Sequence, residues 1–343
     1  MRLIPSSIAP FRTAICALMF LPAAAAVAQP AAAEPATKPV GDVLTVAADG
    51  SADFKTVQAA VDAIPKKSET PHTIVLRPGT YRERVRVPKD VTNVTFRGDG
   101  KDPAATTIVF DYRAGMDDPN NAGKKIGTSG SETVLIEGDG FTAENVTFAN
   151  DAGDKGQAVA VRTRGDKAVF RNCRFTGWQD TLYTNGARHY FADCYIEGRV
   201  DFIFGRATSV FERCTVVSKN GGFVTAASTP VESKYGLVFL DCKLTSDDKG
   251  QTTFLGRPWK PDAQVAYIRC AIGGHIKPEG WNNWGKEENE KTARYVEFGN
   301  TGPGADTSKR VPWAKQLTAD EAAAYTVANV LGGADGWDPT AKK

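Results

Sequence analysis

The sequence predicts an all-β protein that folds as a right-handed parallel β-helix, a solenoid with a short N-terminal capping helix. Three observations lead to this prediction. A short motif repeats along most of the chain, its apolar side chains alternate as they do in β-strands, and helical patterning is nearly absent. Self-similarity at a period of roughly 20–30 residues indicates a solenoid in which each coil buries its face against the next.

The repeat is marked by cysteines. Each copy has an aromatic or apolar residue, two mostly polar residues, a cysteine and, two residues further on, a large apolar side chain. The intervals between the cysteines are 21, 20, 28 and 28 residues. Valine takes the place of cysteine in two earlier copies, so the marked positions are Val94, Val146, Cys173, Cys194, Cys214, Cys242 and Cys270.

The repeated units are interpreted as strands. They are too short, and too rich in Val, Phe, Ile and Thr, to be paired helices. Cys173 and Phe175 are two residues apart, so both side chains would point inward from the same strand. An Asn, Asp or Arg stands immediately before most of the inward residues, which fits a bend between two strands of one coil.

Helical patterning is found in two places. Residues 56–64 read TVQAAVDAI and are followed by Pro65, and a second helical pattern covers residues 318–325. The first helix would cap the open end of the solenoid.

The cysteines have two alternative roles in such a fold. Free cysteine is among the most buried residue types and packs as a small hydrophobe, which predicts an interior ladder. The spacing of neighbouring strands also permits disulfides in an oxidising compartment. Five cysteines follow the apolar N-terminal segment, so at least one would stay unpaired in a monomer.

The N-terminal segment is predicted to be a secretory signal peptide covering residues 1–28. Arg2 and Arg12 precede an apolar run, and the segment ends in Ala26-Val27-Ala28, which is typical of a cleavage site. The run is too short to span a bilayer. Residues 29–40 are rich in Ala and Pro and are predicted to be a flexible linker. We therefore expect a secreted protein, extracellular or periplasmic, with one domain over residues 41–338.

Composition excludes several other functions. Without Arg2 and Arg12, 40 basic residues face 40 acidic ones, so nothing supports nucleic-acid binding. No later apolar stretch approaches membrane-spanning length, so no membrane partner is expected. The G-x-S-x-G, C-x-x-C and H-E-x-x-H motifs are absent, which argues against a serine esterase and against a zinc site.

The repeat also predicts a site. Asp180 lies seven residues after Cys173, and Asp201 lies seven residues after Cys194. Equal offsets place the two carboxylates one above the other, about one strand spacing apart. Gln179 precedes Asp180, and Gln157 lies 22 residues before Gln179, close to one coil. The pattern therefore assembles two carboxylates and two amides on one patch.

The alternative is a solvated turn, since Asp and Asn are common wherever chains bend. Against it, the sequences GWQDTLY and VDFIFG surround each aspartate with apolar and aromatic residues, a costly place for a surface charge. Two carboxylates this close cannot both ionise freely, so one is expected to hold a proton near neutral pH.

The sequence resembles the pectin methylesterases. Five blocks resemble motifs of that family, and two further stretches resemble its C-terminal region: GTYRE (79–83), GQAVAVR (156–162), GWQDTLY (177–183), DFIFG (201–205), LGRPW (255–259), YVEFGNTGPGA (295–305) and YTVANVLGGADGW (325–337). The resemblance runs from about residue 44 to residue 337. It leaves no room for the inhibitor-like pro-region of many plant members.

The resemblance implies a role for each matched residue. Asp201 would be the nucleophile, and Asp180 the acid that protonates methanol and then activates water. Gln157 and Gln179 would donate hydrogen bonds to the oxyanion, and Arg257 would hold Asp201 ionised and oriented. The same resemblance implies a sugar-binding cleft lined by Thr133, Gln157, Tyr183, Phe204, Arg257 and Trp259.

Several of these assignments have a structural alternative. Arg257 could be an ordinary surface ion-pair residue, because its offset from Cys242 does not by itself place it near Asp201. Phe204 and Trp259 could be core residues, as aromatics often are. Trp281 and Trp284 are equally candidates for the cleft rim or for packing, and Glu83 is expected to be structural.

The predicted function is hydrolysis of methyl esters on galacturonan, with pectin as the substrate partner, by a monomer that needs no metal or organic cofactor. One alternative is a polysaccharide lyase or glycoside hydrolase, which also uses carboxylates. The paired glutamines favour acyl transfer over this alternative, because a tetrahedral oxyanion needs donors. The other alternative is a non-catalytic carbohydrate-binding β-helix, which would have no reason to align Asp and Gln.

Overall fold

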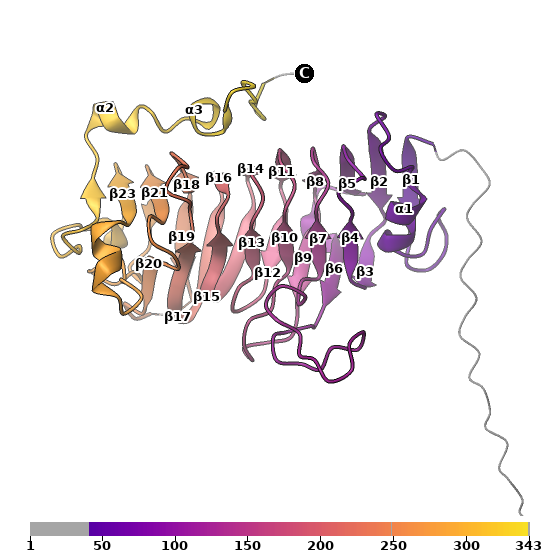
Figure 1. Ribbon diagram of the computed structural model, residues 1–343, viewed down its shortest axis with the longest axis horizontal. Helices are drawn as coiled ribbons and strands as arrows, with labels where there is room; N and C mark the ends of the chain where they lie inside the picture. The colour runs from indigo at the N-terminus through magenta and orange to yellow at the C-terminus, as the bar shows by residue number, and fades with distance from the viewer. Residues whose placement is uncertain (1–40, 248, 342–343) are drawn as a thin grey trace, which may run out of the picture. The chain divides into compact units, whose positions relative to one another are not determined.

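The computed structural model describes residues 41–247 and 249–341, all within one compact unit. The predicted signal peptide and linker lie outside the described residues. The strands of successive coils lie side by side and pair in parallel, as Figure 1 shows. The prediction of a parallel β-helix is confirmed, and its coils have three faces.

The first face is a continuous parallel sheet that runs the length of the solenoid. Its strands, in spatial order, are β1 (Val43–Val46), β2 (His72–Leu76), β5 (Val94–Gly98), β8 (Thr142–Glu144), β11 (Ala168–Arg171), β14 (Arg188–Ala192), β16 (Thr208–Glu212), β18 (Leu237–Leu240), β21 (Gln264–Ile268), β23 (Arg294–Phe298) and β24 (Lys315–Gln316).

The second and third faces are joined by two long strands that belong to both. The second face contains β3 (Gly79–Arg82), β6 (Thr106–Phe110), β9 (Thr147–Asn150), β12 (Arg174–Thr176), β19 (Lys243–Ser246), β22 (Ala271–Ile272) and the first halves of β15 (Tyr195–Gly205) and β17 (Thr215–Ala227). The third face contains β4 (Val85–Val87), β7 (Val134–Ile136), β10 (Val161–Thr163), β13 (Leu182–Thr184), β20 (Thr253–Pro258) and the second halves of β15 and β17.

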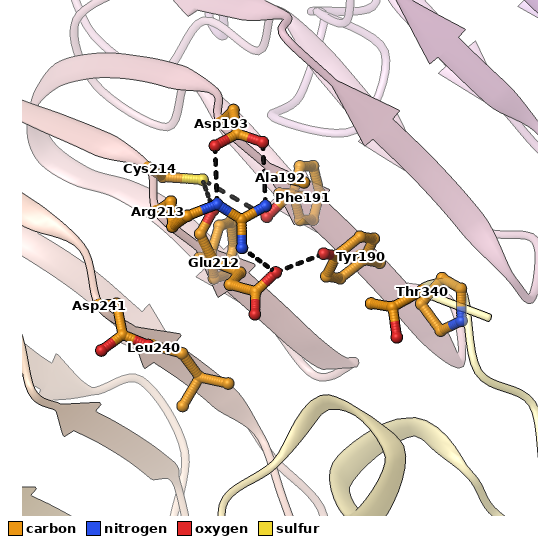
Figure 2. Close-up of polar contacts among 12 residues, drawn as sticks. Tyr190, Phe191, Ala192, Asp193, Glu212, Arg213, Cys214, Leu240, Asp241 and Thr340 are labelled. Atoms are coloured by element: carbon orange, nitrogen blue, oxygen red, sulfur yellow. Dashed lines mark hydrogen bonds and ion pairs between the residues drawn. The ribbon is translucent and has the colours of Figure 1, made fainter. Parts of the chain in front are cut away.

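The bends between the first and second faces explain the repeat. The residue before Val146 and before each of the five cysteines lies at this bend and has a positive φ, between 47° and 57°, in the left-handed region that Asn and Asp tolerate well. Val94 was wrongly placed in this series, because it begins β5 on the first face and pairs with His72. Asp193 and Arg213 occupy this position in neighbouring coils, and Arg213 donates to both oxygens of Asp193 (Figure 2). Arg269 pairs with Asp241 in the same way. These ion pairs therefore connect the bend of one coil to the bend of another coil.

The cysteines form the interior ladder that the sequence predicts. All five are free and buried, and their thiols donate to backbone carbonyls of their own coil or of the preceding one, at 3.2–3.6 Å. A parallel column of aromatic rings lies three residues earlier in each coil, with centroids 4.5–4.8 Å apart: Phe170, Phe191, Phe211, Phe239 and Tyr267. These columns make up much of the core.

The N-terminal end is capped as predicted. Helix α1 (Val57–Ala63) begins after Thr56, whose side chain accepts from the Ala59 amide, and it buries its apolar side against the first coils. Glu83 accepts from the free amides of Val57 and Gln58 at 2.8 and 2.9 Å, which confirms its structural role.

The C-terminal segment differs from the prediction. The pattern at 318–325 gives only the short helix α2 (Ala319–Ala322), which begins with a capping box between Thr318 and Glu321. A further helix, α3 (Val327–Leu331), was not predicted because five residues are too few to show a helical period. It packs Val327, Val330 and Leu331 on the outer side of the first face. The described part of the chain also contains three 3₁₀ turns: Pro103–Ala105, Glu287–Lys291 and Pro303–Ala305.

Candidate active site

The third face carries the two aspartates on adjacent coils. Tyr183 of β13 pairs with Phe204 of β15, and the aspartates stand three residues earlier in each coil. Asp180 also donates its amide to the Val200 carbonyl, at 3.1 Å. Both have positive φ, 65° and 53°, and both side chains line one cavity although they are only 3 % and 5 % exposed. The structure thus brings together the two carboxylates that share an offset from the cysteines.

The two glutamines extend this patch toward the N-terminal coils. Gln157 and Gln179 form a parallel β-bridge, and the Ala158 amide donates to the Gln179 carbonyl at 3.0 Å. The Gln157 side chain donates from Nε2 to Oδ2 of Asp180 at 3.0 Å. Both glutamines line the cavity, so its wall contains two amide donors beside two carboxylates.

Arg257 reaches Asp201 from two coils away. On β20 it pairs with Ala226 of β17, which in turn pairs with Phe204. Because Ala226 has no side chain beyond Cβ, the guanidinium can extend across its coil. Nε donates to Oδ1 of Asp201 at 2.9 Å and an Nη donates to Oδ2 at 2.7 Å, a bidentate arrangement.

Two aromatic rings fix the guanidinium. The Arg257 Cζ atom lies 3.8 Å from the ring centroid of Phe223 and 3.8 Å from that of Trp284. These two cation–π contacts hold the planar group in place. Neither aromatic was predicted to do this, because Phe223 follows a register shift in the β15–β17 pairing that no simple repeat reveals.

The surroundings separate the pKa values of the two aspartates. Burial, and then the negative charge of Asp201, raises the pKa of Asp180 from 3.8 to about 8. Burial also raises the pKa of Asp201, but the hydrogen bonds and charge of Arg257 oppose this. The site therefore holds a proton on Asp180 at neutral pH, while Asp201 is the carboxylate that a cation stabilises.

Aromatic side chains form the rest of the wall. The rings of Tyr183 and Phe204 are stacked with centroids 4.2 Å apart, and the Trp259 ring lies edge-on to both at 6.3 and 6.0 Å. Trp259 is 36 % exposed. The cavity has a volume of about 470 Å³. Tyr183, Phe204 and Trp259 therefore line it, rather than packing wholly in the core.

The expectation for Thr133 is corrected. Its side chain is completely buried and donates to the Ala149 carbonyl at 2.8 Å, so it does not reach the cavity. The cavity is instead lined by Gly127, Thr128 and Ser129, at the end of the excursion over residues 111–133. The turn-forming sequence Gly-Thr-Ser-Gly was the signal that could have pointed to Thr128.

The two candidate rim tryptophans have different positions. Trp281 is 1 % exposed, packs on Tyr267 and Tyr295, and donates from its indole nitrogen to Glu297, so it is a core residue. Trp284 lines the cavity and covers Arg257.

Within residues 41–247 and 249–341, no group of three or more His, Cys, Asp or Glu side chains could hold a metal ion. The same part of the chain contains no helix long and apolar enough to cross a membrane.

The fold is thus a parallel β-helix, and its cavity holds a buried carboxylate pair, two amide groups and an arginine paired with one of the carboxylates. The pectinesterase family model matches residues 43–334. The chain belongs to the pectinesterase family, whose members are carboxylic ester hydrolases.

Relatives and solved structures agree with this family. Pectinesterase 31 of Arabidopsis thaliana is 42 % identical over 284 residues, which cover 82 % of this chain and 89 % of the relative. The pectin methylesterase from carrot superposes with a TM-score of 0.78 at 36 % identity, covering 87 % and 95 % of the two chains. A pectin methylesterase in complex with a hexasaccharide gives a TM-score of 0.75 at 31 % identity, covering 87 % and 98 %. The chain spans about half the length of several curated relatives named as pectinesterase/pectinesterase inhibitor.

Proposed function

We propose that this chain hydrolyses the methyl esters of galacturonan in the cleft around Asp180 and Asp201, releasing methanol and leaving a carboxylated polymer. The observation that carries the proposal is the asymmetric pair: Asp201 is clamped by Arg257, and Asp180 has a pKa raised to about 8. A nucleophile and an acid are thus available together at neutral pH. Membership of the pectinesterase family and the likeness to a solved relative with a bound hexasaccharide support pectin as substrate.

In the first half of the reaction, an Asp201 carboxylate oxygen attacks the ester carbonyl carbon. The carbonyl oxygen becomes an oxyanion, which accepts hydrogen bonds from the amides of Gln157 and Gln179. Collapse of this intermediate breaks the bond to the methoxy group, and Asp180 gives it a proton, so methanol leaves. The product is an anhydride between Asp201 and the galacturonyl group.

In the second half, Asp180 is ionised and takes a proton from water as the water attacks the galacturonyl carbonyl. The second tetrahedral intermediate uses the same amide donors and releases Asp201 as a carboxylate. The substrate unit leaves as a galacturonic acid unit, which loses the remaining water proton to solvent and becomes galacturonate, and Asp180 is again protonated. No step needs a metal or organic cofactor, because five side chains supply the nucleophile, the acid, the donors and the clamp.

The aromatic wall positions the sugar. Tyr183, Phe204 and Trp259 offer apolar surface to pyranose faces and to the ester methyl group, and the exposed Trp259 can contact units beside the reacting one. We assign substrate binding to these residues together with Gln157, Arg257 and Thr128.

The test is methanol release from highly methylated pectin by the purified chain, measured together with new reducing ends. Methanol without new reducing ends is the expected result. New reducing ends or unsaturated sugars would indicate cleavage of the polymer instead, and binding without methanol release would indicate a non-catalytic module.

We also propose the processing that the N-terminal sequence predicts. Residues 1–28 direct export and are then removed, and residues 29–40 form a flexible linker. Residues 41–338 form the enzyme domain, which acts outside the cytoplasm as a monomer. Mass spectrometry of the exported protein should give a mature chain that begins near Gln29, and sedimentation should give a single monomeric species.

A further inference from the structure

The tryptophan that covers Arg257 has an unusual backbone conformation. Trp284 has a φ of 65°, in the left-handed region that a bulky side chain rarely adopts. Its ring centroid lies 3.8 Å from Cζ of Arg257. A strained residue of this kind persists only where its surroundings hold it firmly, and such residues concentrate at functional sites. The contacts that hold Trp284 therefore bear on the position of the guanidinium.

Asparagine side chains hold the loop that carries this tryptophan. Oδ1 of Asn282 accepts from the Trp284 amide at 2.8 Å, and Oδ1 of Asn283 accepts from the Gly285 amide at 2.8 Å. The Asn282 amide also donates to the Gly256 carbonyl at 3.1 Å, which joins the loop to β20. The loop thus has a defined position beside the strand that carries the arginine.

A third asparagine joins the loop to β20 at a second point. Asn289 is only 2 % exposed, and its side-chain amide donates to the Asn283 carbonyl at 3.0 Å and to the Pro258 carbonyl at 3.4 Å. Asn283 directly precedes Trp284, and Pro258 directly follows Arg257. A buried amide is costly to leave without partners, so these two contacts are retained. One side chain therefore fixes the tryptophan and the arginine relative to each other.

We infer that Asn289 is a positioning residue, which holds Trp284 over Arg257 and so keeps the guanidinium aligned with the nucleophile. The inference rests on the proposed function, in which that alignment matters for catalysis. Asn289 is not among the residues that line the cavity, so it acts through Arg257 and not by contact with substrate.

The charged and titratable groups near Asp201 determine what a displaced guanidinium would change. Arg257 donates to its two oxygens at 2.9 and 2.7 Å, and the Asp180 carboxyl lines the same cavity. From the first face, Tyr295 contributes a buried phenol, whose pKa is raised by burial and then by the charge of Asp201. Arg257 is the one cation among these three groups, so poorer alignment of its guanidinium raises the pKa of Asp201.

The first measurement does not depend on turnover. Carboxyl ¹³C NMR gives the pKa of Asp201 in the wild type and in Asn289→Ala, and Asp201→Asn assigns the resonance. Loss of the Asn289 hydrogen bonds corresponds to a rise of about 0.3–1 pH unit. Asn282→Ala, which removes only the acceptor for the Trp284 amide, should raise this pKa as well and serves if Asn289→Ala does not fold.

The matched control removes an asparagine contact elsewhere in the solenoid. Asn300 accepts from the Cys270 amide at 2.8 Å and does not line the cavity, so Asn300→Ala should leave the pKa of Asp201 unchanged. An unchanged pKa in both loop variants, or an equal rise in the control, would overturn the inference.

The second measurement is a double-mutant cycle. Asn289→Ala should lower kcat/KM by about three- to tenfold, mainly through kcat, because it affects the alignment of the nucleophile and not substrate binding. In the Arg257→Gln background the same substitution should cause no further loss. Additive losses would show that Asn289 does not act through Arg257 and would contradict the inference. Absence of methanol from every form would instead refute the proposed function and leave the NMR result to decide the role of Asn289.

Discussion

Asp180 and Asp201 occupy equivalent positions of neighbouring coils and are almost equally buried, but their partners differ. Asp180 accepts a hydrogen bond from the neutral Gln157, whereas Asp201 accepts two from the Arg257 guanidinium. The contact with the Arg257 cation lowers the free-energy cost of ionising Asp201. The negative charge of Asp201 then raises the free-energy cost of ionising Asp180. In the proposed mechanism, one residue type thus serves as both acid and nucleophile.

The raised pKa of Asp180 makes stability depend on pH. Below about pH 4 the carboxyl is protonated in the folded and the unfolded chain, and its contribution is fully present. As pH rises toward the folded pKa of about 8, the unfolded chain ionises first, so the free energy of unfolding falls. In Asp180→Asn this fall should be smaller. Urea unfolding of both proteins at several pH values measures it, and parallel curves would contradict the raised pKa.

Arg257→Gln removes the clamp on a buried carboxylate. The pKa of Asp201 should rise further, so the acidic limb of the pH–rate profile should move to higher pH. Removing one partner of a buried ion pair lowers the free energy of unfolding by about 3–5 kcal/mol. The value of kcat/KM should fall by about 100-fold or more. Arg257→Lys, which keeps the charge but loses the bidentate geometry, should be intermediate. An unshifted acidic limb would show that Arg257 does not control Asp201.

At the scale of the element, the repeat carries most of the information. The residue before each cysteine has the left-handed conformation that a bend between strands requires, so the sequence was sufficient to predict both the ladder and the equal offsets of the aspartates. The sequence was insufficient to place Arg257 beside Asp201. The longer coils and the register shifts between β15 and β17 change the number of residues between equivalent positions of successive coils. Thr133 was misplaced because it directly precedes β7 and four residues separate it from the cavity-lining Ser129, and only the packed structure shows that its side chain is buried.

The cysteine ladder is predicted to be structural. Cys242 is 1 % exposed and donates to the Phe211 carbonyl at 3.2 Å, so Cys242→Ala leaves a small cavity and an unmade contact. The free energy of unfolding should fall by about 1–3 kcal/mol, with kcat nearly unchanged. Urea denaturation and methanol release check the two parts. Loss of turnover after mild alkylation of the still-folded native protein would contradict the packing role.

At the scale of the molecule, coil stacking places side chains from distant sequence positions in one cleft. Four coils each contribute one polar side chain: Gln157, Asp180, Asp201 and Arg257. Parallel pairing between successive coils holds these positions in register. Sequence reasoning reached the class of fold, the two aspartates and Gln157 through the repeat, whereas only the family resemblance pointed to Arg257. It could not reach the continuation of the cleft past Trp259, because side chains from four separate segments of the chain form it.

In the proposed mechanism these side chains supply every role in the reaction, so activity should not depend on a metal ion. Methanol release after exhaustive treatment with EDTA should equal that of untreated enzyme, with the ionic strength of the two assays matched. Loss of activity that calcium restores would contradict the mechanism and favour a lyase.

The central claim is that Asp201 forms the covalent bond to substrate. Asp201→Asn should abolish turnover while keeping the fold, since an amide cannot replace the carboxylate nucleophile. Asp180→Asn should be about 10²- to 10⁴-fold slower, because it lacks a positioned acid and base. The most direct measurement is acid quenching of Asp180→Asn during reaction with methylated oligogalacturonate, followed by peptide mass spectrometry. A galacturonyl adduct on Asp201 is the predicted result; an adduct on Asp180, or full activity in Asp201→Asn, would contradict it.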